Sequence, residues 1–114
     1  MPPPSAPLNQ ELAKAIVRAH HERLGRGSPR ARVFRSEEIL VVVLHDPFTK
    51  GEQSLLASGR GAAVIELRQQ FEQMMEAELV EIVERLTGRS VEAFMSTTHV
   101  ASEIVVELFV LDGF

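Results

Sequence analysis

The chain has 114 residues, of which 45% are hydrophobic and 25% charged, as is usual for one globular domain. Its net charge of −4 does not create the positive field that attracts nucleic acid or an anionic bilayer. The lack of Cys excludes disulfides, thiolate zinc sites and thiol nucleophiles. The only aromatic residues are six Phe, too few for the stacking surfaces of single-stranded nucleic-acid binders. We therefore expect no nucleic-acid partner.

The first residues are rich in proline. Residues 1–8 hold four prolines and have neither the basic start nor the apolar run of a secretion signal, so we expect a disordered lead-in followed by a single domain over 9–114. Apolar residues then recur at helical spacing. This pattern predicts a helix over 10–24, with Asn9 as its N-cap and Gly25 as its C-terminal stop.

Two strands follow that helix. The segments 32–35 and 38–45 have strand composition and are joined by a turn at Ser36-Glu37. The apolar run 39–44 lacks polar alternation, which predicts a central strand covered on both faces. It is also the longest apolar stretch, far below the roughly 20 residues that span a bilayer. We therefore expect no direct membrane insertion.

The middle of the chain predicts two helices. Thr49 and Glu52 have the spacing of a capping box, which starts a short helix over 50–58. Gly59-Arg60-Gly61 interrupts it, and a long helix over 62–87 ends at Thr87-Gly88. Such a helix measures roughly 39 Å, whereas a strand covers only about 17–20 Å. The uncovered apolar part predicts a homodimer through helix 62–87; the alternatives are a membrane partner over the same surface, or a bend in the helix that folds it onto its own core.

A second hairpin closes the chain, with strands over 90–95 and 104–111 and the linker 96–102 between them. The element order is α-β-β-α-α-β-β. This order predicts an α+β two-layer sandwich, with a largely antiparallel four-stranded sheet and helices on one face.

The segment 23–35 contains five arginines and no acidic residue. Its glycines free backbone amides, and arginine binds carboxylates or phosphates bidentately, so a small anion site is one interpretation. The other is a solvated loop whose arginines pair with acids of the long helix. The anion-site hypothesis involves Arg26, Gly27, Arg30, Arg32 and, at the helix corner, Arg60. The structural interpretation assigns turns or caps to Gly25, Gly27, Thr49, Glu52, Gly59 and Gly88.

The histidines and acids predict no catalytic or metal site. His20, His21 and Glu22 point in successive directions around a helix, so they need partners from elsewhere to hold one ion. His99 beside Ser96 lacks the glycines of a nucleophile elbow. The charged residues of the long helix predict its solvated face: Glu66, Arg68, Glu72, Glu76, Glu78, Glu81, Glu84 and Arg85. We expect no cofactor and no enzymatic activity.

Several features occur in a fixed order along residues 9–111: a Gly-Arg-Gly turn at 25–27, a strand pair, Thr49 and Glu52 ahead of Leu55, Gly59-Arg60 before a long helix with Arg68, Thr87-Gly88 after it, and a hairpin ending in Phe109-Val110-Leu111. In this order they resemble the MpsC family, a bacterial family named for a sodium-translocating, membrane-potential-generating system. The resemblance implies a small cytoplasmic accessory protein, linked to a membrane system for cation or bicarbonate uptake. Any translocation then belongs to a separate membrane transporter subunit.

Two functions compete on this basis. The first is a non-enzymatic accessory or regulatory module that acts by protein contact as a dimer. The alternative is a small-anion sensor that uses the arginine-rich loop 23–35.

Overall fold

The computed structural model describes residues 6–25 and 30–114 and shows three helices and four strands in those ranges. The helices are α1 (Ala6–Leu24), α2 (Lys50–Ala57) and α3 (Gly61–Thr87). The strands are β1 (Arg30–Ser36), β2 (Ile39–His45), β3 (Val91–His99) and β4 (Ile104–Leu111). The predicted α-β-β-α-α-β-β order and the α+β class are confirmed.

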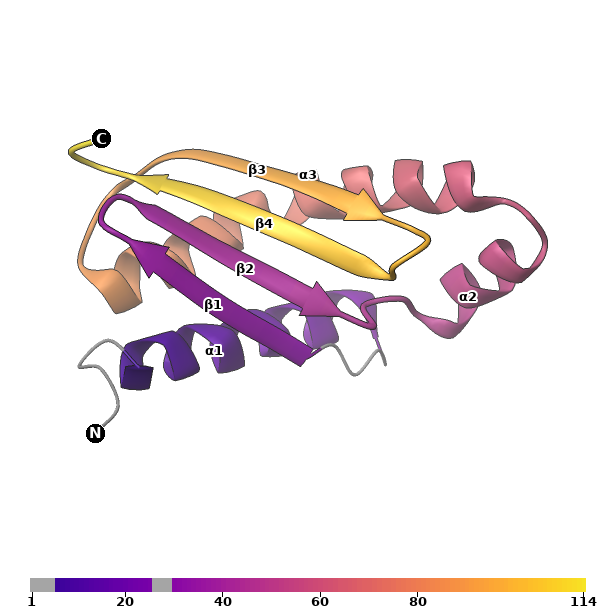
Figure 1. Ribbon diagram of the computed structural model, residues 1–114, viewed down its shortest axis with the longest axis horizontal. Coiled ribbons are helices and arrows are strands. Elements are labelled where there is room, and N and C mark those ends of the chain that lie inside the picture. Colours follow the sequence, from indigo (N-terminus) through magenta and orange to yellow (C-terminus); the bar gives the residue numbers. More distant parts are fainter. Residues whose placement is uncertain (1–5, 26–29) are drawn as a thin grey trace.

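The four strands form one antiparallel sheet in the order β1-β2-β4-β3. The predicted central position of β2 is therefore confirmed, and β4 is the other central strand. Helices α1 and α3 lie against one face of this sheet, whereas α2 lies beyond the strand ends (Figure 1).

The expectation that both faces of β2 are covered was wrong. Leu40, Val42 and Leu44 are buried under the helices, while Val41 and Val43 on the other face are only half-buried. The apolar run therefore reflects two different surroundings: a core on one face and an open, apolar sheet surface on the other. A run without polar alternation cannot distinguish a covered face from an apolar face that is left open.

The first helix begins earlier than predicted. It starts at Ala6 rather than at residue 10, so residues 6–8 of the expected lead-in are helical, while residues 1–5 lie outside the described residues. Pro7 is compatible with this start because the first turn of a helix leaves its amides without helical partners. Asn9 is therefore not the N-cap. Its side chain instead accepts a hydrogen bond from Arg35 Nε (2.9 Å) and donates one to Val33 O (3.4 Å), which joins α1 to β1.

Both hairpins extend further than their composition predicts. Strand β1 begins at Arg30, which pairs with His45 of β2. This register places the first turn at Glu37 and Glu38, one residue later than predicted. Strand β3 continues to His99 through most of the predicted linker, where residues 96–99 pair with residues 104–107 of β4. Small polar residues become strand here because the neighbouring strand offers a continuous hydrogen-bonding edge.

Helix α3 contacts different parts of the chain along its length. Its C-terminal half enters the main core through Met75, Leu79, Ile82 and Val83, which pack with residues of α1 and of the sheet. Its N-terminal half buries Val64 and Arg68 where α3 meets α2 and Phe48. The helix thus has its apolar residues largely covered by its own chain. It ends as predicted at Gly88, whose φ of 72° is a left-handed conformation that glycine adopts without strain.

Candidate functional site

A cluster of three ionisable side chains lies in the centre of the molecule, between the helices and the sheet. His20 comes from α1, Glu72 from α3 and Glu107 from β4, and their relative exposures are 3%, 3% and 0%. His20 Nε2 lies 2.7 Å from Glu107 Oε2, and one nitrogen or oxygen atom from each residue lies within 4.8 Å of the others. We call these three residues the central cluster.

A buried ion pair joins α2 to α3 through Arg68, which lies one turn before Glu72 on α3. Arg68 Nε donates to Glu52 Oε2 (2.8 Å), and its Nη2 donates to Glu52 Oε1 (3.0 Å) and to the Pro47 carbonyl. The guanidinium also lies 5.6 Å from the centre of the Phe48 ring. Arg68 therefore binds the loop before α2 and the first turn of α2 to the long helix.

The predicted capping box at the start of α2 is confirmed. Thr49 Oγ1 accepts a hydrogen bond from the Glu52 amide (3.2 Å), and Glu52 Oε1 accepts one from the Thr49 amide (2.9 Å). Glu52 is also 2% exposed and carries the ion pair with Arg68, a contact that the capping pattern does not predict.

If both carboxyls were ionised, the central cluster would contain more negative charge than its neighbours compensate. The charge of Arg68 is offset by Glu52, and among the described residues His20 is the basic group that contacts a cluster carboxyl, 2.7 Å from Glu107. Glu72 Oε2, Glu107 Oε1 and Arg68 Nη1 are buried and find no hydrogen-bond partner among the described residues. Unsatisfied buried polar atoms are uncommon and indicate strain, a function or an absent ligand.

Burial controls the protonation of the central cluster. Loss of solvent raises the pKa of Glu72 to about 9, and the hydrogen bond and negative charge of Glu107 add to this effect. Burial also raises the pKa of Glu107, to about 7, and lowers the pKa of His20, because the interior disfavours the charged forms. The two carboxyls therefore share a proton at neutral pH when no other cation neutralises them.

The prediction that Arg68 and Glu72 belong to the solvated face of the long helix was wrong. Both residues lie in the buried series Val64, Arg68, Glu72, Met75 and Leu79, with the spacing of three and four that marks one helix face. That register was the signal available in the sequence. Charge predicts exposure on an isolated helix, and this rule fails where the partners of the charged groups come from other elements.

The sequence also contained weaker signals for the other cluster residues. Glu107 is the one charged residue in the apolar run of β4, and it lies on the face that carries Val105 and Phe109. His20 was expected to need partners from elsewhere. Those partners are Glu72 and Glu107, which are 52 and 87 positions away along the chain.

The described residues of the anion-site hypothesis form no common site: Arg30 and Arg32 lie on β1 and Arg60 lies at the start of α3. Arg26 and Gly27 fall outside the described residues. Arg30 forms an exposed pair with Asp46 (3.0 Å), Arg32 lies over the Phe34 ring on β1, and Arg60 is the N-cap residue of α3. Among the described arginines of this segment, Arg23 forms the pairing expected by the structural interpretation, because it donates to Glu78 of the long helix (2.9 Å). The other glycines assigned to turns, Gly25 and Gly59, have φ values of 78° and 76°.

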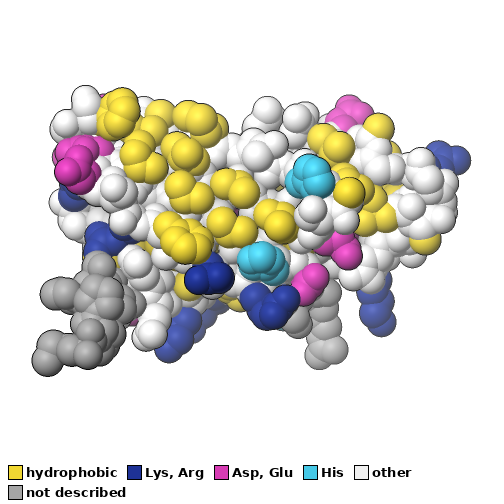
Figure 2. All heavy atoms as spheres, in the orientation of Figure 1, with side chains coloured by type: hydrophobic (Ala, Val, Ile, Leu, Met, Phe, Trp, Pro, Cys, Tyr) yellow, Lys and Arg dark blue, Asp and Glu magenta, His cyan; other side chains and the backbone are white. Residues whose placement is uncertain are grey.

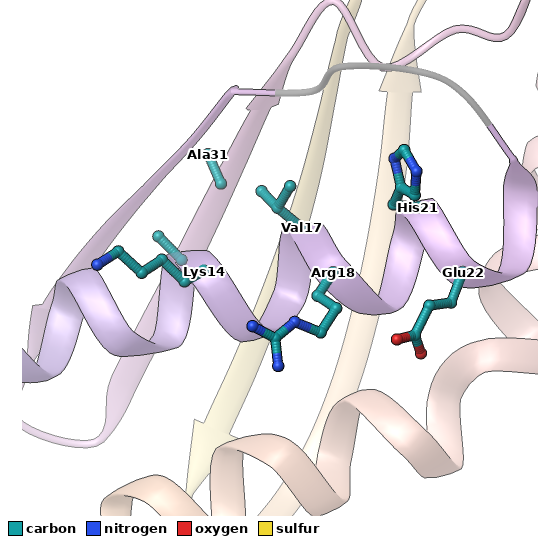
Figure 3. Close-up of a pocket in the computed structure, with 7 residues that line it drawn as sticks. Lys14, Val17, Arg18, His21, Glu22 and Ala31 are labelled. Carbon is teal, nitrogen blue, oxygen red and sulfur yellow. The ribbon is translucent and has the colours of Figure 1, made fainter.

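A hollow with a volume of about 590 Å³ lies between α1 and β1. Figure 3 shows the side chains that line it, mostly from one side of α1, with Ala31 from β1. Val17 and His21 project from one side of α1, whereas Arg18 and Glu22 project from the other side (Figure 3). The charged groups therefore diverge, and the hollow does not assemble a set of ligands.

The sheet face opposite the helices is apolar and not covered by the described chain. Figure 2 shows hydrophobic side chains gathered across its middle. The strand register places them in rows, such as Phe34, Val41, Leu108 and Met95 across the four strands. We call this surface the open sheet face; its apolar residues are Phe34, Ile39, Val41, Val43, Ala93, Met95, Ile104, Val106, Leu108 and Val110.

Fold and site together define a small α+β protein with a buried polar cluster and an exposed apolar sheet surface. In the ranges 6–25 and 30–114, no helix combines the length and hydropathy needed to cross a membrane. The family model described as Na+-translocating membrane potential-generating system (MpsC) matches residues 5–113. The chain therefore belongs to the MpsC family. Neither a curated protein nor a solved structure matches the chain.

Proposed function

We propose that this protein is a non-enzymatic cytoplasmic accessory protein of a sodium-dependent, membrane-potential-generating system, and that it works as a homodimer. Family membership supports the association with such a system. The observation that carries the mode of action is the open sheet face, because an apolar surface of this kind serves protein contact. The proposed occupant of that face is a second copy of the chain.

The size of the open sheet face suits such a contact. Seven residues of strand at about 3.3 Å each and four strands at about 4.8 Å give roughly 23 Å by 19 Å, or about 440 Å². Patches of this size are among the largest that monomers expose, and they are often functional. Two such faces give a flat area of about 900 Å², slightly below the roughly 1,000 Å² of accessible surface that a specific interface buries. The accessible surface is larger than the flat area because side chains project from the sheet.

The open sheet face also suits a two-fold dimer better than the predicted surface on helix 62–87. The apolar residues of α3 are largely covered by α1, α2 and the sheet, with Ile65 and Met74 as its exposed large apolar residues. On the open sheet face, two central strands expose rows of Val, Ile and Leu. A two-fold axis through their middle brings apolar rows against apolar rows, which closes the assembly.

The test of dimerisation uses two matched substitutions. Met95→Lys places a charge on the open sheet face, and Met74→Lys places the same charge on α3; the native side chains are 52% and 57% exposed. We expect wild type and Met74→Lys to have the dimer mass in sedimentation equilibrium, and Met95→Lys to have the monomer mass. A monomeric wild type refutes the dimer. If Met74→Lys is monomeric and Met95→Lys is dimeric, the interface lies on α3 and not on the open sheet face.

The accessory role is tested in cells that lack the chain. We expect the sodium-dependent membrane potential, followed with a voltage-sensitive dye, to fall in these cells and to recover with wild type and Met74→Lys. Met95→Lys should not restore it, although its melting temperature should show that it folds. An unchanged potential in the deletion strain contradicts the accessory role. Full recovery with a monomeric Met95→Lys contradicts the need for a dimer.

A further inference from the structure

We propose that His20, Glu72 and Glu107 bind one divalent transition-metal ion that joins α1, α3 and β4. No step of the proposed accessory function requires this site, so either proposal can fail without the other.

The geometry of the central cluster is close to that of a metal site. Metal bonds of about 2.1 Å to nitrogen and oxygen place neighbouring ligand atoms about 3.4 Å apart in a tetrahedral site. One ligand atom from each of the three residues already lies within 4.8 Å of the others. These atoms thus lie within about 1.4 Å of the mutual separations that a tetrahedral site needs.

The unsatisfied atoms favour a cation at this place. Glu72 Oε2 and Glu107 Oε1 are buried without a hydrogen-bond partner among the described residues, although each is an acceptor. Arg68, one turn before Glu72 on α3, donates two hydrogen bonds to Glu52, and its Nη1 has no hydrogen-bond partner among the described residues. A divalent ion supplies the charge that two buried carboxylates lack and gives their free oxygens a partner.

The ligand types select the class of ion. One imidazole nitrogen with two carboxylates suits Zn²⁺, Mn²⁺ or Fe²⁺. Mg²⁺ and Ca²⁺ prefer sets made of oxygen ligands only, and Ca²⁺ takes six to eight of them. We therefore expect Zn²⁺ and Mn²⁺ to bind, and Mg²⁺ to bind at least tenfold more weakly.

A surface hollow borders the central cluster at Glu72. It has a volume of about 370 Å³ and lies between α3 and β3. Gln69, Gln73, Glu76 and Ser96 supply polar groups to its wall, beside Phe94 and Met95. Because Glu72 belongs to both this hollow and the buried cluster, the proposed entry of the ion is through this hollow.

The experiment is a titration of the untagged, chelator-treated full chain with Zn²⁺ and with Mn²⁺. Isothermal calorimetry should show one ion per chain, and the melting temperature should rise with ion concentration because the folded state alone assembles the site. Glu72→Gln and Glu107→Gln preserve shape but remove a charged ligand, so each should weaken binding at least tenfold.

Matched controls separate the buried site from surface histidines and acids. His21→Ala and Glu66→Gln change exposed residues, one next to His20 and the other on α3 away from the hollow, and they should bind as wild type does. The proposal is overturned if wild type binds neither Zn²⁺ nor Mn²⁺ at 1 mM, because protons alone then neutralise the cluster. It is also overturned if Glu72→Gln and Glu107→Gln leave the affinity unchanged.

Discussion

Glu52 combines two stabilising interactions within one side chain. Its carboxylate accepts the Thr49 amide at the start of α2 and also binds the Arg68 guanidinium. A buried ion pair of this kind is costly to break, because one charge is then left in the interior without compensation. The cap therefore helps to place the carboxylate that holds Arg68.

We predict that Thr49→Ala lowers the free energy of unfolding by about 1 kcal/mol, the usual effect of losing a Ser or Thr cap. The hydroxyl that accepts the Glu52 amide is lost, while the Arg68 pair remains. Urea denaturation measures the change, and Thr49→Ser, which keeps the hydroxyl, should resemble wild type. Equal stability of Thr49→Ala and wild type would show that the cap contributes nothing measurable.

We predict that the metal-free protein loses stability as the pH rises from 7.5 to 9. The pKa of Glu72 is raised to about 9 in the folded state, by burial and by Glu107, so the folded chain keeps a proton that the unfolded chain has released. Raising the pH therefore favours unfolding, by on the order of 1–2 kcal/mol over this range. The lowered pKa of His20 acts in the opposite direction, but only below its ordinary value of 6.5.

Urea denaturation in the presence of a chelator at pH 7.5, 8.25 and 9 tests this effect. Glu72→Gln cannot titrate and should remove the slope, whereas the exposed Glu76→Gln should retain it. If wild type unfolds with the same free energy at both ends of the range, Glu72 does not hold a proton in the folded state.

Helix α3 consists of two halves held by different contacts. Residues 75–83 contribute four side chains to the main core, together with residues of α1, β2 and β4. The half that contains Val64 and Arg68 packs on α2 and Phe48, outside that core cluster. Local stability follows the apolar contacts that each segment makes, so the two halves should open with different free energies.

Hydrogen exchange measures this difference along one continuous helix. We predict that amides of residues 65–71 exchange faster than those of residues 76–86, because the first group is released when α2 and Phe48 detach. Phe48→Ala should accelerate exchange in 65–71 and leave 76–86 nearly unchanged. Equal protection across the helix would mean that α2, Phe48 and the main core unfold as one unit.

At the scale of the whole molecule, the fold has two layers and one uncovered apolar surface. The helices bury one side of the sheet, and the open sheet face remains available to a partner (Figure 2). If a second copy covers it, unfolding includes dissociation, and stability depends on protein concentration.

We therefore predict that the melting temperature of wild type rises when the protein concentration increases from 1 to 100 μM. Mass action favours the dimer at high concentration, and the unfolded chain has no such contact. Differential scanning calorimetry should show the shift for wild type and Met74→Lys, but not for Met95→Lys. A melting temperature that is independent of concentration in wild type would contradict a dimer that dissociates in this range.

The sequence by itself determined the element order, the fold class and the capping box at Thr49 and Glu52. These features rest on local chemistry, namely hydrophobic periodicity, turn residues and a hydrogen-bonding pattern that spans four residues. The errors at the start of α1 and at the end of β3 have different causes. Pro7 is allowed in a first helical turn by a local rule, whereas residues 96–99 become strand because β4 pairs with them.

Only the tertiary structure decided what covers each apolar face and which charged residues are buried. The positions of Arg68 and Glu72 in the sequence fit either a buried helix face or a charged, solvent-exposed one. The groups that pair with them in the interior come from other elements. The uncovered face of β2 has the same apolar composition as the covered one. Burial depends on contacts between residues far apart in the chain, and no local pattern encodes the partner that a side chain will meet.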